Sequence, residues 1–586
     1  MSFEGEDLGF VSDAYAAPML LQDAQTCINF YVEIDSQPHA KKPIALLGCP
    51  GLNPVLTTQT GAVRGAWVLP GGKTALFVTG NTLYLATVTV PATQTTIAQF
   101  SMATVGTLLT NTGPVSIRDN GVIFGGAGGY AVIVDGIYGY YYRIGGAGTI
   151  TFAGTVASGS VTFTPSGTVN QYLVVGSLIT GAGIAVGTSI SSIDFNANTI
   201  TLSQAATSTP GVNTYTVTAA AYGQITDPGF LGADRIAFIE GWLIFNQPGT
   251  RTFYTTGPIP YTLSFPGSFF ALKDSSTDNL ITLQENVREL WLIGERTSEV
   301  WFNVGAANFA FQRLPGIGPQ MGCAAKHSIT RVGDSLAWLG RNEQGENVVV
   351  MTSQYAIRRA SNHAVEHSIA SFPLVSDAIG YAYQEEGHLF YMLTFPTADV
   401  TWCLDVTVWE RTQGAMGWHQ RLSWDSTNGV YRRHRSNCFC NLQDLRLVGD
   451  YQTGQVHQMS RAFYTDAGNV LRAQRRTPHV WSRDNRKRVF QSGIQVEFTP
   501  GVGLQTGQGS NPQAMLRWSN DGGQNWSNEH WTTIGAAGAT KNRAIWRRLG
   551  KARDRVYELN YSDPTARDII GATLFGEGEN DQEEAA

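Results

Sequence analysis

The sequence lacks any segment expected to enter or cross a membrane. None of its apolar runs approaches the ~18 residues that a membrane span requires, and its start, MSFEGEDLGF, has neither the basic nor the apolar region of a secretory signal. Its six cysteines are scattered, and the one close pair, Cys438 and Cys440, has a spacing unsuited to metal binding. These absences predict reduced, structural thiols in a protein made in a cytoplasm, with no membrane-spanning segment.

The motifs of common catalytic sites are also missing. The sequence contains no G-x-S-x-G elbow, no phosphate-binding P-loop and no H-E-x-x-H zinc motif. No combination of acids or histidines stands out as a catalytic set or as a set of metal ligands. We therefore expect a protein that is not an enzyme, that uses no cofactor and no metal, and that has no catalytic residue to name.

Charged residues are scarce and unevenly placed. They make up 15% of the chain, where roughly a quarter is usual for a soluble protein. The segment 432–488 holds twelve Lys and Arg against four Asp, so with a net charge of −6 the rest of the chain carries −14. Low charge combined with 14 tryptophans predicts that much of the surface is covered by other subunits.

Short β-hairpins are abundant. The runs Glu289–Ile293 and Ser298–Val304 flank a short loop, and Ser335–Gly340 and Asn347–Thr352 repeat the plan. Apolar residues occupy both faces of the first run, which indicates a strand covered on both sides.

The spacing of the hairpins indicates the architecture. Turn glycines at positions 241, 294, 345 and 387 are 53, 51 and 42 residues apart, close to the ~40–50 residues of a propeller blade. We predict an all-β protein built on a β-propeller of about six blades. Radial closure of such a fold leaves only short strand edges exposed.

Composition divides the chain into five regions. Residues 147–221 are rich in Gly, Thr, Ser and Val with Asp194 as their only charge, and are predicted to form an inserted, small β-sandwich-like domain. Residues 1–146 are assigned to an N-terminal arm and the first blades, and 222–430 to the remaining blades. Residues 431–576 are predicted as a basic β region with closing strands, and 577–586 as an acidic, disordered tail.

One turn motif stands out near the C-terminus. Ser519, Asp521, Gly523 and Trp526 fit the Asp-box pattern S-x-D-x-G-x-x-W, in which Asp caps a hairpin turn, Gly takes a positive φ and Trp packs beneath. The motif is common in sialidase-like propellers, so a carbohydrate-binding or glycan-hydrolysing propeller is an alternative function. The box is a fold device that lies away from their chemistry, and we interpret it as a structural turn.

Basic residues gather in clusters interleaved with aromatic side chains. The candidate residues are Arg432, Arg433, Arg435, Arg475, Arg476, Arg483, Arg486, Lys487 and Arg488. They could contact DNA phosphates or dock acidic surfaces of neighbouring subunits, and a second strip, Lys541–Arg555, has the same two interpretations. We favour docking, and we predict that the lining of any DNA channel is neutral to acidic.

Several segments, in order, resemble the tail nozzle proteins of short-tailed bacteriophages, also called tail hub or packaged-DNA stabilisation proteins. The segments are Cys27–Ile34, Lys41–Leu52, Arg64–Ala86, Asp135–Tyr142, Ala233–Thr250, Asn279–Phe372 and Ala544–Pro564. The resemblance covers most of the chain apart from the insert and the acidic tail.

The resemblance implies a structural protein of the virion, assembled in the host cytoplasm. Such proteins form a homo-hexameric ring below the portal and its adaptor ring. The ring extends and gates a channel through which double-stranded DNA passes without sequence-specific binding, and a plug or needle can close it. It also carries tail fibres or tailspikes. A trimeric receptor-binding fibre is a further alternative, which three-fold rather than six-fold symmetry would reveal.

Overall fold

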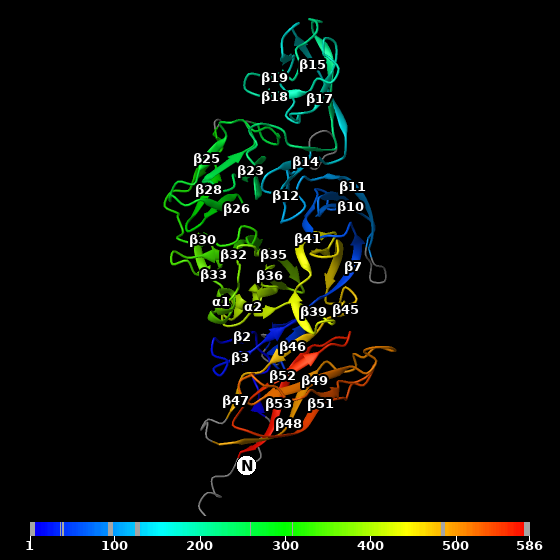
Figure 1. Cartoon of the computed structure of the whole chain (residues 1–586), viewed down its shortest axis with the longest axis vertical. Helices are drawn as coiled ribbons and strands as arrows, with labels where there is room; N and C mark the ends of the chain where they lie inside the picture. The colour runs from blue at the N-terminus through cyan, green and yellow to red at the C-terminus, as the bar shows by residue number, and fades with distance from the viewer. Residues whose placement is uncertain are drawn as a thin grey trace, which may run out of the picture.

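The computed structural model describes residues 6–35, 37, 40–91, 98–122, 129–257, 259–306, 309–481 and 487–578. Over these ranges the chain is nearly all strand, with the two short helices α1 (His363–Ala370) and α2 (Val406–Arg411). No helix in the described ranges is long and apolar enough to span a membrane. Figure 1 shows a β-propeller in the middle, an inserted module at one end and a β-sandwich at the other.

The propeller consists of seven sheets in the described part of the chain. The first blade is β8 (Val63–Val68), β9 (Thr74–Thr79), β10 (Thr82–Val90) and β11 (Gln99–Thr107). The second is β12 (Ser116–Asp119), β13 (Tyr130–Val134), β14 (Gly139–Arg143) and β21 (Tyr222–Gln224). The third is β22 (Ile236–Ile239), β23 (Trp242–Asn246), β24 (Thr252–Thr255) and β25 (Phe270–Leu272). The fourth is β26 (Leu280–Asn286), β27 (Glu289–Gly294), β28 (Ser298–Asn303) and β29 (Phe311–Arg313).

The remaining three blades complete the ring. The fifth is β30 (Gly322–Cys323), β31 (Thr330–Val332), β32 (Ser335–Arg341), β33 (Asn347–Ser353) and β34 (Ala356–Arg359). The sixth is β35 (Ile379–Glu385), β36 (His388–Phe395), β37 (Val400–Asp405) and β38 (Trp418–Gln420). The seventh is β41 (Ser436–Leu442), β42 (Leu445–Asp450), β43 (Gln455–Ser460) and β7 (Gly51–Thr57).

The ring is closed by a strand from the N-terminal region. The inner strands β8, β12, β22, β26, β31, β35 and β41 contact one another in that order, and β41 contacts β8. β7 immediately precedes the first blade, yet it pairs antiparallel with β43 of the seventh. Main-chain hydrogen bonds between the two ends of the propeller therefore hold the circle shut.

Two expectations about the propeller need correction. The hairpin spacing predicted about six blades, whereas the described residues form seven. Three strands of the seventh blade, β41, β42 and β43, lie inside the 431–576 region for which the composition predicts a separate basic β region. Composition is misleading here because Arg432, Arg433 and Arg435 come just before its first strand, and because its fourth strand is contributed from far upstream.

The insert is a small closed sheet between β14 and β21. Its strands are β15 (Gly148–Val156), β16 (Thr162–Pro165), β17 (Leu178–Thr180), β18 (Ile190–Asp194), β19 (Thr199–Leu202) and β20 (Asn213–Ala219). They pair in the order β17-β20-β15-β16-β19-β18, and bonds such as Ile179 N to Thr188 O at 3.0 Å join the two edges. The module is thus a barrel around Phe163 and Tyr215, rather than the predicted sandwich-like fold.

Two sheets form the sandwich. One contains β5 (Phe30–Ile34), β6 (Ile44–Gly48), β53 (Ile569–Gly578), β48 (Val489–Phe498) and β51 (Ala544–Ala552), with β1 (Glu6–Asp7) beside β53. The other contains β4 (Cys27–Ile28), β46 (Ala473–Arg476), β52 (Asp554–Tyr561), β49 (Gln513–Ser519), β50 (His530–Thr533) and β47 (Val480–Trp481). Short strand pairs complete the fold: β2 (Tyr15–Ala16) with β3 (Ala24–Gln25), β39 (Leu422–Asp425) with β40 (Val430–Arg433), and β44 (Thr465–Asp466) with β45 (Asn469–Val470).

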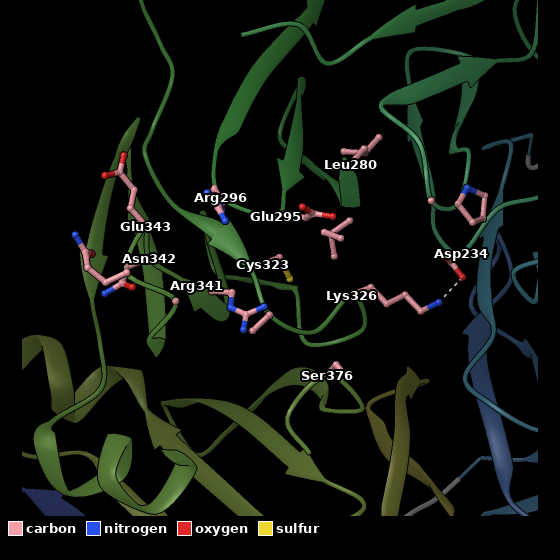
Figure 2. Close-up of a pocket in the computed structure, with 16 residues that line it drawn as sticks. Asp234, Leu280, Glu295, Arg296, Cys323, Lys326, Arg341, Asn342, Glu343 and Ser376 are labelled. Atoms are coloured by element: carbon pink, nitrogen blue, oxygen red, sulfur yellow. Dashed lines mark hydrogen bonds and ion pairs between the residues drawn. The ribbon is translucent and has the colours of Figure 1, made fainter. Parts of the chain in front are cut away.

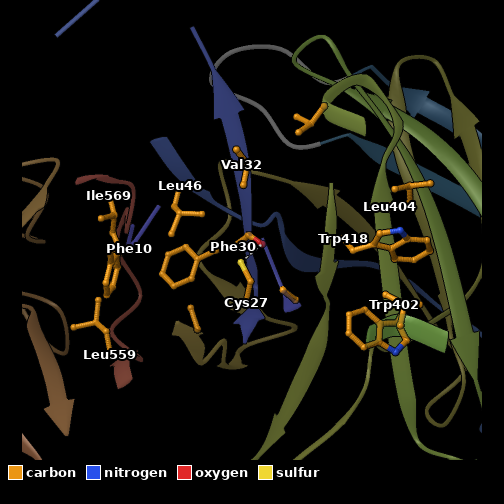
Figure 3. Packing of buried hydrophobic residues seen from close by; sticks show 14 of the residues in the cluster. Phe10, Cys27, Phe30, Val32, Leu46, Trp402, Leu404, Trp418, Leu559 and Ile569 are labelled. Carbon is orange, nitrogen blue, oxygen red and sulfur yellow. Dashed lines mark hydrogen bonds between the residues drawn. The ribbon is translucent and has the colours of Figure 1, made fainter. Parts of the chain in front are cut away.

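The N-terminal strands join the propeller to the sandwich. β4 pairs in parallel with β38 of the sixth blade and antiparallel with β46 of the sandwich, so one sheet crosses the boundary. Figure 3 shows Phe30 between Trp418 on the propeller side and Leu559 on the sandwich side, and all three are buried. Because this apolar core is continuous, burial of its side chains ties the two bodies together.

Candidate functional site

The inner strands of all seven blades enclose a cavity of about 340 Å³ on the propeller axis. Its lining includes the four cations Arg64, Arg118, Arg235 and Arg331 but a single carboxylate, Glu285. These residues come from five different blades, and no local sequence pattern connects them. The propeller's own channel is therefore narrow and basic.

Two of the channel arginines, Arg118 and Arg235, join one blade to another. Arg118 Nη2 lies 3.0 Å from Glu285 Oε1, and the Arg118 guanidinium stacks 4.3 Å from the ring of Trp67. Arg235 Nη2 donates to Gln284 Oε1 at 2.7 Å, and burial together with nearby Arg118 lowers the pKa of Arg235 to about 10. These contacts fill the axis with side chains that hold the ring together. No DNA duplex fits this space, since its major groove alone is about 12 Å wide.

A larger pocket of about 740 Å³ adjoins the channel (Figure 2). Turns of the third, fourth and fifth blades line it with three cations and three carboxylates: Arg296, Lys326, Arg341, Asp234, Glu295 and Glu343. Figure 2 shows Lys326 extending to Asp234, with Nζ and Oδ1 2.6 Å apart. The pocket is balanced in charge, and no group of three potential metal ligands occurs among the residues that the structure describes.

The Asp box forms the turn between β49 and β50 of the sandwich. Gln524 N and Asn525 N donate to Asp521 Oδ1 at 3.0 and 2.9 Å, and Gly523 has a φ of +96°. The bond from Asn525 N, with other donors, lowers the pKa of Asp521 to about 2. Trp526 Nε1 donates to Gly523 O at 3.0 Å. None of these residues lines the channel or the adjoining pocket.

The first basic cluster, Arg432, Arg433 and Arg435, makes its contacts within the subunit. Arg432 pairs with Asp399 at 3.1 Å, and Arg435 pairs with Asp450 at 3.0 Å. The guanidinium of Arg433 is buried and stacks 3.7 Å from the ring of Tyr451. None of the three lines the propeller channel.

The second basic cluster, Arg475 and Arg476, makes hydrogen bonds inside the sandwich and to the N-terminal segment. Arg475 is fully buried and donates to the carbonyls of Phe10, Asp13 and Thr26. Arg476 Nε donates to Glu558 Oε2 at 2.6 Å.

The third cluster is only partly described. Arg483 and Arg486 lie outside the described residues, whereas Lys487 is half-buried and Arg488 is exposed. A docking or DNA-contacting role for all three clusters stays a prediction, and the side chains with internal partners are poorly placed for it.

The six cysteines are all unpaired, and five of them are buried. Burial raises the pKa of the Cys27 and Cys323 thiols to about 12. Such thiols are protonated at neutral pH and therefore poor nucleophiles and metal ligands.

Comparison with protein families gives two matches that follow the two main bodies. Residues 124–464 match the family described as bacteriophage P22 Gp10, β-propeller, and residues 472–575 match the one described as bacteriophage P22 Gp10, β-sandwich. The first match begins after the first blade, so the propeller extends beyond the matched segment. A comparison with curated proteins gives no match.

Solved structures give distant likenesses. The Dos1 propeller is 8% identical, with 70% of this chain and 95% of that chain covered and a TM-score of 0.32. An exo-β-1,3-galactanase from Phanerochaete chrysosporium is 10% identical (72% and 100% covered, TM-score 0.21). The phage phi92 endosialidase is 12% identical (88% and 69% covered, TM-score 0.25). At these scores the likenesses carry no argument about activity.

Proposed function

This chain belongs to the bacteriophage P22 Gp10 family, and from that membership we propose that it forms the nozzle ring of a short phage tail. It is a structural protein of the virion tail. In the proposed role, six copies close into a ring below the portal and its adaptor. The ring extends the DNA channel, narrows it after packaging and retains the genome until ejection.

The observation that carries the proposal is the family match over both the propeller and the sandwich. The dimensions of the propeller also limit where DNA could pass through such a ring. Because the propeller axis is filled by side chains and leaves about 340 Å³, the DNA passage of such a ring has to lie between subunits. The channel arginines then serve the fold of each subunit, and the wall of the passage is formed by outer surfaces.

The proposed partners follow from a ring at this position. One rim would contact the adaptor ring and the other would carry tail fibres or tailspikes, with a plug or needle in the opening. The barrel insert and the sandwich lie at opposite ends of the subunit (Figure 1). A subunit of this shape offers two separate ends for two different sets of partners.

The test uses phage whose gene for this protein carries a stop codon. We expect heads that package DNA but release it, so that the DNA becomes sensitive to nuclease. Addition of the purified protein restores protection. Nuclease-resistant DNA in particles that lack the protein would contradict the proposal. As a parallel arm, the purified protein is incubated with host polysaccharide, and we expect no release of reducing ends.

A further inference from the structure

One edge of the sandwich gathers positive charges without partners. β51, at the lower right of Figure 1, ends its sheet and is paired with β48 alone among the described strands. Seven exposed basic residues lie on it or beside it: Arg488, Lys541, Arg543, Arg547, Arg548, Lys551 and Arg553. Lys551 has a contact of its own, and the side chains of the other six make no hydrogen bond or ion pair with any residue in the described ranges.

Elsewhere in the sandwich, arginines have internal partners. Arg476 and Arg517 both donate to Glu558 at 2.6 Å. Arg555 Nη1 donates to Gln491 Oε1 at 2.9 Å and to Leu549 O at 2.6 Å. The edge is therefore a distinct feature of the domain, since six of its seven exposed cations make no hydrogen bond or ion pair within the described part of the fold.

The strand orders these charges into a line. Trp546, Leu549 and Ala552 are buried and face the core, while Arg547 and Arg553 are exposed on the other side. At ~3.3 Å per residue, the ten steps from Arg543 to Arg553 span at most roughly 33 Å, because the bulge at Arg548, where φ is +61°, shortens the strand. This length is close to one turn of a DNA duplex. The line is thus long enough to follow several successive phosphates.

Edge protection alone does not account for this pattern. A charge of either sign can keep an exposed edge strand from pairing with another chain. All six of the residues without partners, however, are cations, and five of them are arginines. A folded neighbouring protein presents acids and bases interspersed, as the 46 acids and 40 bases of this chain illustrate. A row of one sign fits a polyanion better, and the guanidinium fork matches phosphate oxygens.

We propose that the β51 edge is a docking surface for the phosphate backbone of double-stranded DNA, bound without regard to sequence. The aromatic side chain within the strand, Trp546, is buried, so the line itself has no platform on which unpaired bases could stack. Contacts to phosphates alone position a duplex and do not specify its sequence. The inference rests on the proposed function only for the presence of DNA in the tail.

Binding of the purified full-length chain to a fluorescent duplex of about 30 base pairs, roughly three helical turns, tests the proposal by anisotropy at increasing salt. We expect the logarithm of the affinity to fall linearly with the logarithm of the salt concentration, with a slope of about −4.5 to −5.4 for five or six phosphate contacts. The variant Arg543→Glu/Arg547→Glu/Arg553→Glu keeps a charged edge and should bind at least tenfold more weakly.

A matched control separates this surface from net charge. Lys73→Glu/Arg313→Glu/Arg358→Glu changes three exposed propeller cations by the same total charge and should alter binding by less than twofold. Equal losses in both variants, or none in the edge variant, would overturn the proposal. So would an edge variant that binds DNA normally but no longer associates with other copies, because the edge would then dock protein. The nuclease test of the proposed function is independent of these results.

Discussion

His388 of the sixth blade and Glu33 of the sandwich strand β5 lie 2.6 Å apart, Nε2 to Oε2. The other ring nitrogen of His388, Nδ1, is 2.6 Å from Asp405 Oδ2. Asp405 in turn caps helix α2 by accepting a hydrogen bond from Val408 N at 3.2 Å. One imidazole therefore links the propeller to the sandwich through two carboxylates.

This link predicts a pH-dependent contribution to stability. Burial lowers the pKa of His388, but the bonds with Asp405 and Glu33 outweigh it and the pKa is raised above 6.5. This stabilisation is fully present at pH values below the pKa that His388 has in the unfolded chain. It is lost as the pH rises through the higher pKa of His388 in the folded protein. We expect His388→Gln to lower the free energy of unfolding by about 2 kcal/mol at pH 6, a low value for a buried pair because Glu33 is partly exposed. Urea denaturation should show a smaller loss at pH 9, and equal losses at both pH values would contradict this account.

Arg475 predicts a large effect from a conservative change. Its guanidinium donates to three main-chain carbonyls of the N-terminal segment, at Phe10, Asp13 and Thr26. Lysine keeps the charge but cannot reproduce that fork, so buried acceptors are left unsatisfied. We expect Arg475→Lys to cost about 3 kcal/mol in urea denaturation. The matched change at exposed Arg488 should stay within about 0.5 kcal/mol, and a similar effect at both sites would contradict a structural role for Arg475.

The Asp box predicts a local change at a surface turn. Asp521 accepts hydrogen bonds from the amides of Gln524 and Asn525. We therefore expect Asp521→Ala to speed hydrogen exchange at those two amides and to leave the rest of the sandwich unaffected. Because the pKa of Asp521 is lowered to about 2, its contribution is lost only as the pH falls through that value. The protection should therefore persist at pH 4. Loss of binding or activity toward a glycan in this variant would instead support a carbohydrate function.

The fold was largely predictable from the sequence, because a propeller repeats a local pattern. The hairpin at Glu289–Ile293 and Ser298–Val304 corresponds to β27 and β28, and the all-β class is confirmed. The turn-glycine spacing misses the seventh blade because the hairpin between β41 and β42 turns at Gln443 and Asp444, which have positive φ, and not at a glycine. The fourth strand of that blade, β7, also pairs with β43 from far upstream. Hairpin spacing records local neighbours and holds no information on such a distant pairing.

The candidate sites were harder to predict, for a related reason. A cluster of arginines in sequence indicates positive charge, but the partner of each side chain depends on the fold. Arg435 forms an ion pair with Asp450, and Arg476 forms one with Glu558, which lies on another strand of the sheet. The strip 541–555 was noted in the sequence as well, yet only its pairing at a sheet edge distinguishes it from the neutralised clusters.

Because β7 closes the propeller ring, we expect the buried contacts of β7 to be critical for the stability of the propeller. Leu52 on β7 is buried against the seventh blade, opposite Met459. We expect Leu52→Ala to lower the free energy of unfolding by about 2–5 kcal/mol and to make the propeller more sensitive to protease. The control Leu109→Ala changes a side chain that is 64% exposed and should have an effect within about 0.5 kcal/mol. A neutral Leu52→Ala would mean that β7 is not needed to close the ring.

The most direct test of the central claim is an electron cryo-microscopy reconstruction of the tail of intact virions, with the packaged DNA in place. The account predicts six copies of this chain in a ring below the head, with DNA density on the ring axis and outside every propeller. A three-fold arrangement on a protruding fibre, DNA density threading a propeller channel, or absence of the chain from the tail would contradict it.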